Sequence, residues 1–236
     1  MGLEGKRVLV VGAGSGIGFG VAEAVIRSGA DVVLASRDAA KVSAAAGRLG
    51  AAATGAVLDV TDEASVEAFF GAGQGFDHIA FTAGDWDIPR RMPLADIDFA
   101  MAPRLFQVRF WGALAVAKHG AKSLPPGGSL TLTGGMIAHR PAKGAAVSSA
   151  MAGAIESLAR ALAVEMAPVR VNCVCPGVTR TERIPPEREA EFARFTANQL
   201  LPRLGEVGEV AQAYLYLMQG GYTTGQVLQV EGGGKL

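Results

Sequence analysis

The sequence feature that most constrains the fold is a glycine-rich turn near the start of the chain. Gly12, Gly16 and Gly18 follow the apolar run 7–11 and precede an amphipathic stretch, 17–28. Glycine permits a tight turn and lets backbone N–H groups approach a phosphate, whose charge the N-terminus of the next helix favours. Any strand–helix turn can use glycine, and the spacing G-x-x-x-G-x-G differs from the general dinucleotide fingerprint. The position between strand and helix predicts a phosphate-binding turn.

The rest of the chain alternates short apolar runs with longer amphipathic stretches, which is typical of βαβ units and a parallel sheet. Strands are expected at residues 7–11, 31–35, 56–58, 76–81, 129–133, 169–174 and 226–230. Helices are expected at residues 17–28, 39–49, 99–122, 147–166, 207–218 and within 185–200, and Thr61 is expected to cap one more. Pro103 marks a kink or boundary near the start of the first long helix. The predicted fold class is α/β: a Rossmann-type doubly wound parallel sheet of about seven strands with helices on both faces, in a single domain over residues 1–236.

The charge balance limits the classes of partner. Twenty-two basic residues match twenty-two acidic ones, so no net field attracts nucleic acid or an anionic membrane. No apolar run approaches the roughly 20 residues that cross a bilayer, and the chain enters its first strand at once. We expect a soluble, cytoplasmic protein with no nucleic-acid and no membrane partner.

The two cysteines, Cys173 and Cys175, stand two residues apart and so share one face of an expected strand. Free cysteine usually behaves as a small buried hydrophobe. A metal site would need further Cys or His at ligand spacing, and the three histidines, His78, His119 and His139, are scattered along the chain. The sequence therefore predicts no metal site.

The end of the second strand decides which form of dinucleotide fits. An acidic residue there accepts hydrogen bonds from the ribose 2′-OH and repels a 2′-phosphate. Ser36 takes that place and Arg37 follows it, whereas Asp31 begins the strand and faces away from the adenosine. The planar guanidinium of Arg37 suits a 2′-phosphate, although an arginine here can also begin a solvated helix. These residues predict NADP(H) as the cofactor.

Motifs along nearly the whole chain resemble the short-chain dehydrogenase/reductase family in order and spacing. They are the turn 12–18, the segments 58–62, 82–84, 170–172 and 176–179, and the C-terminal segments 224–226 and 231–233. The resemblance implies an oxidoreductase with a small-molecule substrate, which the sequence does not name, and a homodimer or homotetramer formed through the two long helices. Together with the strand-end argument, it places the following residues at the cofactor: Gly12, Ser15, Gly16, Ile17, Gly18, Ser36, Arg37, Asp59, Val60, Thr82, Ala83, Gly84, Pro176, Gly177, Val178 and Thr179.

The same resemblance locates four catalytic positions, and none carries the family's residue. The family uses Asn, Ser, Tyr and Lys for general acid–base chemistry beside a cofactor that supplies the hydride. In that order, the aligned positions hold Arg109, Gly135, Ser148 and Ala152. All the tyrosines of the chain lie in its C-terminal part, at Tyr214, Tyr216 and Tyr222. The catalytic residues are therefore unknown from the sequence.

Other residues are candidates for the substrate pocket. A guanidinium at Arg109 in an otherwise apolar pocket needs an anionic partner, either a substrate carboxylate, phosphate or oxyanion, or a nearby acid. His139 and Lys143 are candidate substitute acids or, alternatively, solvated loop residues. Trp86, within the run 85–87, is expected either to line the substrate pocket or to cover the core. The pair 90–91 is expected in a solvated turn. The segment 185–200 matches the position of the family's substrate lid.

Three functions are compatible with these residues. The first is an NADP(H)-dependent oxidoreductase with substituted proton machinery, which family membership favours. The second is a catalytically silent cofactor-binding protein that acts as a sensor or partner subunit. The third is a lyase or isomerase that uses Arg109 on an anionic substrate without redox chemistry.

Overall fold

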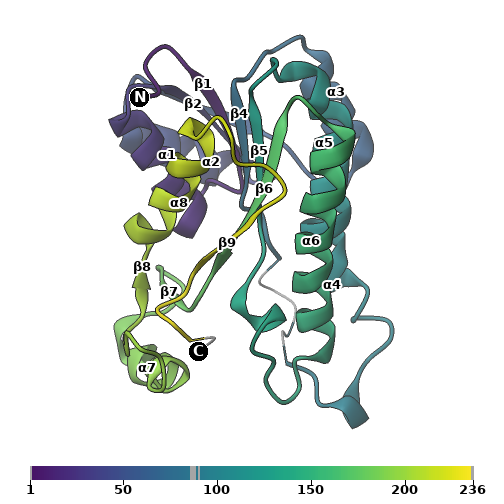
Figure 1. Ribbon diagram of the computed structural model, residues 1–236, viewed down its shortest axis with the longest axis vertical. Coiled ribbons are helices and arrows are strands. Elements are labelled where there is room, and N and C mark those ends of the chain that lie inside the picture. The colour runs from purple at the N-terminus through teal and green to yellow at the C-terminus, as the bar shows by residue number, and fades with distance from the viewer. Residues whose placement is uncertain (1, 86–88, 90, 235–236) are drawn as a thin grey trace.

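The computed structural model describes residues 2–85, 89 and 91–234, so the expectations for Trp86, Asp87 and Arg90 lie outside the described residues. Seven strands form one parallel sheet in the order β3-β2-β1-β4-β5-β6-β9 (Figure 1). They are β1 (Arg7–Val11), β2 (Asp31–Ser36), β3 (Ala53–Val57), β4 (His78–Phe81), β5 (Ser129–Thr133), β6 (Arg170–Pro176) and β9 (Val227–Val230). The predicted doubly wound parallel sheet is confirmed.

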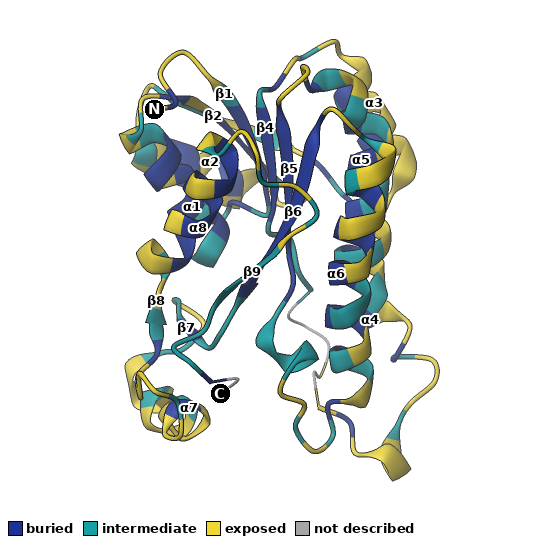
Figure 2. Ribbon diagram, viewed as in Figure 1, coloured by how far each residue is buried: buried dark blue, intermediate teal, exposed yellow. Residues whose placement is uncertain are grey.

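Helices cover both faces of this sheet. One layer holds α1 (Gly16–Arg27), α2 (Ala39–Leu49) and α8 (Val207–Gln219), and the other holds α3 (Glu63–Gly71), α5 (Ala113–Gly120) and α6 (Ala146–Glu165). Side chains along β1 alternate between the two cores: Val8 and Val10 pack with α1 and α8, and Leu9 and Val11 pack with α5 and α6. Strands that are apolar on both faces need both faces covered, and Figure 2 shows the central strands as a buried layer between the helices.

The predicted long helix over 99–122 is shorter and segmented. It begins after Pro103, the N-cap of α4 (Arg104–Phe106), and continues through a π-helical turn, η2 (Gln107–Gly112), into α5 and the 3-10 turn η3 (Ala121–Ser123). Proline suits a helix start because it lacks the N–H that an interior turn needs. π-Helical turns concentrate at functional sites, and η2 carries Arg109.

Two local predictions were wrong, and one small element was missed. β3 begins three residues before the expected strand. Asp62, not Thr61, caps α3 by accepting a hydrogen bond from the backbone N–H of Ala64 at 3.0 Å, because the Thr61 hydroxyl donates to Asp59 instead. The strands β7 (Thr179–Arg180) and β8 (Gly205–Glu206) pair outside the main sheet. The sequence did not predict them, because a strand of two residues is too short to show an alternating pattern.

Among the described residues, α6 alone is long and apolar enough to cross a membrane by length and composition. In this fold, 44% of its apolar window is buried. Ile155 and Ala159 on this helix belong to the core shared with β5 and β6. This is the packing of a core helix.

Candidate functional site

The predicted cofactor residues gather along the carboxyl edge of the sheet. Each predicted segment lies at or just after the carboxyl end of a strand. The segments are 12–18 after β1, 36–37 at β2, 59–60 after β3, 82–84 after β4 and 176–179 at β6. The carboxyl ends of parallel strands are where such sheets bind ligands. The fold thus brings together segments that lie far apart in the chain, from residue 12 to residue 179.

The glycine turn lies against the end of β4. Gly12 has a φ of +89°, and a Cβ added there would lie 2.5 Å from the backbone nitrogen of Ala83. A Cβ at Gly18 would lie 2.4 Å from both the carbonyl oxygen of Gly12 and the hydroxyl of Thr82. The Thr82 hydroxyl in turn donates to the carbonyl of Val11 at 2.9 Å. Only glycine fits at positions 12 and 18, because strand ends and helix meet there at van der Waals distance.

The N-terminus of α1 already holds a carboxylate of the chain itself. The backbone N–H of Gly16 donates to Oε2 of Glu182 at 3.1 Å, and the methyl carbon of Thr181 lies 3.6 Å from the Cβ position of residue 16. Free N–H groups at a helix N-terminus attract anions. Sequence reasoning missed both Thr181 and Glu182, and the one signal for them was their place just after the segment 176–179.

The residues that were predicted to contact the adenosine lie at the ends of β2 and β3. The N–H of Gly12 donates to the carbonyl of Ala35 at 2.8 Å, so the turn runs beside Ser36, the last residue of β2, and the exposed Arg37. Asp31 pairs with Arg7 at the opposite end of the strand, as predicted. Asp59 accepts two hydrogen bonds from Thr61, from its N–H at 2.9 Å and its hydroxyl at 2.7 Å.

On the C-terminal side, the segment 176–179 is fixed by β9 and its own turn. The N–H of Gly177 donates to the carbonyl of Val230 at 2.9 Å, and a Cβ at Gly177 would lie 2.9 Å from the Cα of Glu231. Thr179 donates its hydroxyl to the carbonyl of Gly177 at 3.1 Å. Val178 precedes Thr179, the first residue of β7. These contacts hold the backbone after β6 close to β9.

Arg109 lies between the ends of β4 and β5. Its Nη1 donates to the carbonyl of Gly134 at 3.2 Å, and its guanidinium atoms lie 2.9 to 3.2 Å from the Cβ position of Gly84. Its Nε is buried, and burial lowers the pKa of the guanidinium. A larger residue at position 84 would displace the Arg109 side chain from this place.

The other three positions that the resemblance predicts to be catalytic carry little chemistry. Gly135 is extended, and among the described residues no atom lies within 4 Å of its Cβ position. Ser148 is buried and donates its hydroxyl to the carbonyl of Ala145 at 3.1 Å. Ala152, one turn further along α6, is 3% exposed. A serine hydroxyl that already donates to the helix cannot do the work of a tuned phenol.

The three tyrosines lie away from Ser148, the position that the sequence resemblance assigned to the family's tyrosine. Tyr214 comes from α8 on the opposite face of the sheet, and its hydroxyl lies 2.6 Å from that of Thr133. It is fully buried, and burial raises its pKa. Tyr216 and Tyr222 are exposed on or after the same helix.

His139, a candidate acid from the sequence, pairs with a buried carboxylate. Its Nε2 lies 2.7 Å from Oε1 of Glu156 on α6, whereas Lys143 is exposed. Cys173 and Cys175 are buried as predicted. Cys175 lies within 4.8 Å of both His139 and Glu156, measured between their ligand atoms. Spacing along the chain did not predict this cluster, because its members come from three different elements.

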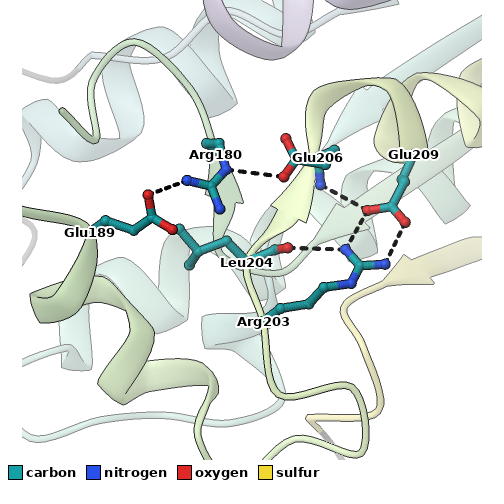
Figure 3. Close-up of polar contacts among 6 residues, drawn as sticks. All are labelled: Arg180, Glu189, Arg203, Leu204, Glu206 and Glu209. Carbon is teal, nitrogen blue, oxygen red and sulfur yellow. Dashed lines mark hydrogen bonds and ion pairs between the residues drawn. The ribbon is translucent and has the colours of Figure 1, made fainter. Parts of the chain in front are cut away.

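The segment between β7 and α8 is tied down by ion pairs (Figure 3). Arg180 on β7 binds Glu189 of α7 (Glu189–Thr196), and its Nε donates to Glu206 on β8 at 3.0 Å. Arg203 makes two hydrogen bonds to Glu209, at 2.7 and 2.8 Å. The resulting network holds the predicted lid segment onto the start of α8 and positions residues 181–182 beside the glycine turn.

The match to known proteins covers nearly the whole chain. A family model described as enoyl-(acyl carrier protein) reductase matches residues 12–235. The short-chain dehydrogenase/reductase ucsE of Acremonium sp is 38% identical, over 98% of this chain and 96% of that protein. The MalC Reductase/Diels-Alderase from Malbranchea aurantiaca superposes with a TM-score of 0.90 at 32% identity, over 98% of this chain and 96% of that chain. A small-chain dehydrogenase in complex with NADPH superposes with a TM-score of 0.79 at 32% identity, over 98% of both chains. This chain belongs to the short-chain dehydrogenase/reductase family of oxidoreductases, whose members bind a nicotinamide cofactor.

Proposed function

We propose that this protein is an NADP(H)-dependent oxidoreductase whose proton machinery differs from that of its family. The observation that carries this proposal is the glycine turn, whose Gly16 N–H already binds a carboxylate oxygen, next to Arg37 at the end of β2. The turn suits a pyrophosphate, and the guanidinium of Arg37 suits a 2′-phosphate. The NADPH complex of a structural relative gives further support.

The residues fit this cofactor along the carboxyl edge of the sheet. The N–H groups of the turn 12–18 would hold the pyrophosphate, and Ser36 with Arg37 would hold the phosphorylated ribose. The cofactor supplies a hydride when bound. Pro176, Gly177, Val178 and Thr179 would line its nicotinamide end, beside the ends of β4 and β5.

Arg109 supplies the positive charge at the catalytic positions. Its guanidinium lies at the carbonyl of Gly134 and against Gly84, next to Gly135 and on the helical segment that faces α6. A buried guanidinium stabilises negative charge strongly because little water screens it. Arg109 would therefore orient an anionic substrate group or steady a developing oxyanion. His139 and Lys143 remain the candidates for the proton donor.

A second function is favoured by one specific observation. Four catalytic positions hold Arg109, Gly135, Ser148 and Ala152, and a structural relative is described as a Reductase/Diels-Alderase. The scaffold of this chain can therefore serve a reaction without hydride transfer, such as a lyase or isomerase reaction on an anionic substrate. The same four residues also suit a catalytically silent cofactor-binding protein.

Cofactor titration followed by a substrate screen separates these functions. We expect saturable binding that prefers NADPH over NADH, measured by fluorescence and thermal shift. Arg37→Asp should weaken NADPH binding by about 10- to 100-fold, because a charge-assisted contact of about 1.5–3 kcal/mol is replaced by repulsion. Unchanged NADPH affinity in this variant would contradict the assignment of Arg37.

The screen decides between the redox and the other functions. A panel of carbonyl compounds and alcohols should produce oxidation of NADPH or reduction of NADP⁺ with the wild-type protein. Tight NADPH binding without turnover on any member of the panel would favour a silent binder. Turnover of an anionic substrate that persists without cofactor would favour the lyase or isomerase.

We also propose a homodimer or homotetramer formed through the two long helical segments. Trp111 on η2 is 54% exposed, and Val164 on α6 is 80% exposed, so an interface through these two segments would cover both apolar side chains. Light scattering after size-exclusion chromatography should report a multimer, and Trp111→Glu should shift it toward the monomer. A cytoplasmic location remains an expectation from the sequence.

A further inference from the structure

Three side chains with metal-ligating atoms meet between the end of β5, the middle of α6 and the end of β6. His139 follows the turn η4 (Met136–Ala138), Glu156 lies on α6, and Cys175 lies on β6. The imidazole nitrogen, the carboxylate oxygen and the thiol sulfur all lie within 4.8 Å of one another. We propose that His139, Glu156 and Cys175 form a zinc-binding site.

The ligand set suits zinc better than the hard cations. Zn²⁺ binds imidazole nitrogen, thiolate sulfur and carboxylate oxygen at about 2.0 to 2.3 Å, whereas Mg²⁺ and Ca²⁺ prefer oxygen. Around a tetrahedral ion with such bonds, ligand atoms stand roughly 3–4 Å apart. The His139–Glu156 distance of 2.7 Å would have to widen slightly, and the rest of the cluster would close around the ion.

The charge around Cys175 favours a dication. Glu156 is 5% exposed, and a buried carboxylate needs a cation or hydrogen-bond donors. Burial, followed by the charge of Glu156 and with a smaller contribution from Glu231, raises the pKa of the Cys175 thiol to about 12. One thiolate and one carboxylate would neutralise Zn²⁺, and a bound metal ion deprotonates a coordinating thiol.

A buried acceptor near the cluster supports the same conclusion. Oε2 of Glu231 is buried, and no described residue donates a hydrogen bond to it. A carboxylate oxygen buried without a donor is costly. A cation at the cluster would reduce that cost through its positive charge.

The surroundings leave room for a fourth ligand. The side-chain amide of Gln229 lies 3.4 Å from Nε2 of His139, and the sulfur of Met136 lies 3.9 Å from that of Cys175. The side chain of His139 is 21% exposed, so solvent can reach the cluster. Three protein ligands with one open position are the arrangement of zinc sites that keep a bound water.

Cys173 provides a matched control on the same strand. It is buried like Cys175 and two residues away, but it packs against Gly134, where its sulfur lies 3.0 Å from the Cβ position. Burial raises the pKa of the Cys173 thiol, and the positive charge of nearby Arg109 offsets a small part of that rise. That positive charge disfavours a metal ion at Cys173, so the two cysteines should differ sharply in metal binding.

The test is metal titration of the full-length protein after treatment with a chelator. Calorimetry with Zn²⁺ should give one ion per chain for the wild type and for Cys173→Ser. Cys175→Ser and His139→Asn should bind at least about tenfold more weakly, because each removes one of three ligands. Circular dichroism establishes which variants are folded, and none of these measurements depends on cofactor or activity.

Substitution with Co²⁺ gives a readout that needs no variant. A thiolate-to-cobalt absorption band in the near ultraviolet should appear for the wild type and for Cys173→Ser. Absence of that band in the wild type would overturn the proposal, whether or not Cys175→Ser folds. Equal Zn²⁺ affinity of folded Cys173→Ser and Cys175→Ser would overturn it as well.

Discussion

The two halves of the carboxyl edge of the sheet are built in different ways. The half that is predicted to hold the cofactor (the cofactor half) follows β1, β2, β3 and β4 and offers mainly backbone groups, as the contact between the Gly16 N–H and Glu182 illustrates. The half that is predicted to be catalytic (the catalytic half) is formed by η2, β5, η4 and α6 and offers single side chains. The four positions that the sequence resemblance assigned there hold Arg109, Gly135, Ser148 and Ala152. A backbone-built site is preserved as long as the turn is preserved, whereas a side-chain site changes with one substitution.

Restoring the family's side chains is the sharpest way to test this contrast. The combined variant Gly135→Ser, Ser148→Tyr and Ala152→Lys should raise the rate of NADPH-dependent reduction of a generic diketone by about 100-fold or more, because a positioned acid is worth about 10²–10⁴ in rate. A steady-state assay that follows NADPH absorbance measures it.

The control for that variant is its stability. Gly135 has open space for a side chain among the described residues, but Ser148 and Ala152 are buried. Larger residues at these two positions lower the free energy of unfolding by about 1–3 kcal/mol through overpacking. Thermal unfolding of the variant must therefore be measured beside the assay. A folded triple variant as slow as the parent would mean that the catalytic half has lost more than these side chains.

Disturbing the backbone of the cofactor half should have the next largest effect. Gly18→Ala places a methyl group 2.4 Å from Gly12 and Thr82 atoms, so the turn must move, at a cost of about 1–3 kcal/mol in unfolding free energy. We expect NADPH affinity to fall by tenfold or more, as roughly 1.4 kcal/mol corresponds to tenfold. Calorimetric titration with NADPH measures the change.

Gly153→Ala is the matched substitution in the catalytic half. No described atom lies within 4 Å of that Cβ position on α6, and alanine in a helix interior is about 1 kcal/mol more favourable than glycine. This variant should be more stable and bind NADPH normally. Similar losses in both variants would mean that glycine content, rather than the close approach at Gly18, governs the site.

The amino edge of the sheet, opposite the edge that carries both halves, should respond to pH. His78 on β4 bonds Ser129 on β5 at 2.8 Å, and burial lowers the pKa of this histidine from 6.5 to about 4. Between these values the unfolded chain binds the extra proton, so the free energy of unfolding should fall with pH from 6.5 to 4, by up to about 3 kcal/mol. Denaturant unfolding at several pH values measures the slope.

His78→Gln removes that titrating group and serves as the comparison. Its unfolding free energy should depend less on pH over the same interval, whatever its absolute stability. An identical slope in the two proteins would assign the pH dependence to other groups.

The smallest expected effect concerns the carboxylate that lies on the glycine turn. Glu182 must leave Gly16 before a pyrophosphate can take its place, and charge at a helix N-terminus is worth about 0.3–1 kcal/mol. Glu182→Gln should therefore tighten NADPH binding by about two- to fivefold. Glu187→Gln, an exposed residue of the same segment, should leave the affinity unchanged, and weaker binding by Glu182→Gln would instead make Glu182 part of the cofactor site.

Local pattern was enough to predict the parallel sheet. The limits of β1, α2 and β5 agree with the expected ranges to the residue, because apolar alternation and flanking turn residues mark them. The limits of β3 were missed, since only part of that edge strand is apolar. The cap of α3 was assigned to Thr61 rather than Asp62, because neighbouring residues can compete for the same role.

The sequence by itself determined the succession of strands and helices along the chain and the place of the glycine turn, because these depend on short-range periodicity and on residue identity. Tertiary structure alone decided where Arg109 points, that Glu182 lies on Gly16, and that His139, Glu156 and Cys175 meet. Those contacts join elements far apart in the chain, and their geometry follows from how helices dock on the sheet. No spacing rule encodes that docking, since it is set by packing across the whole core.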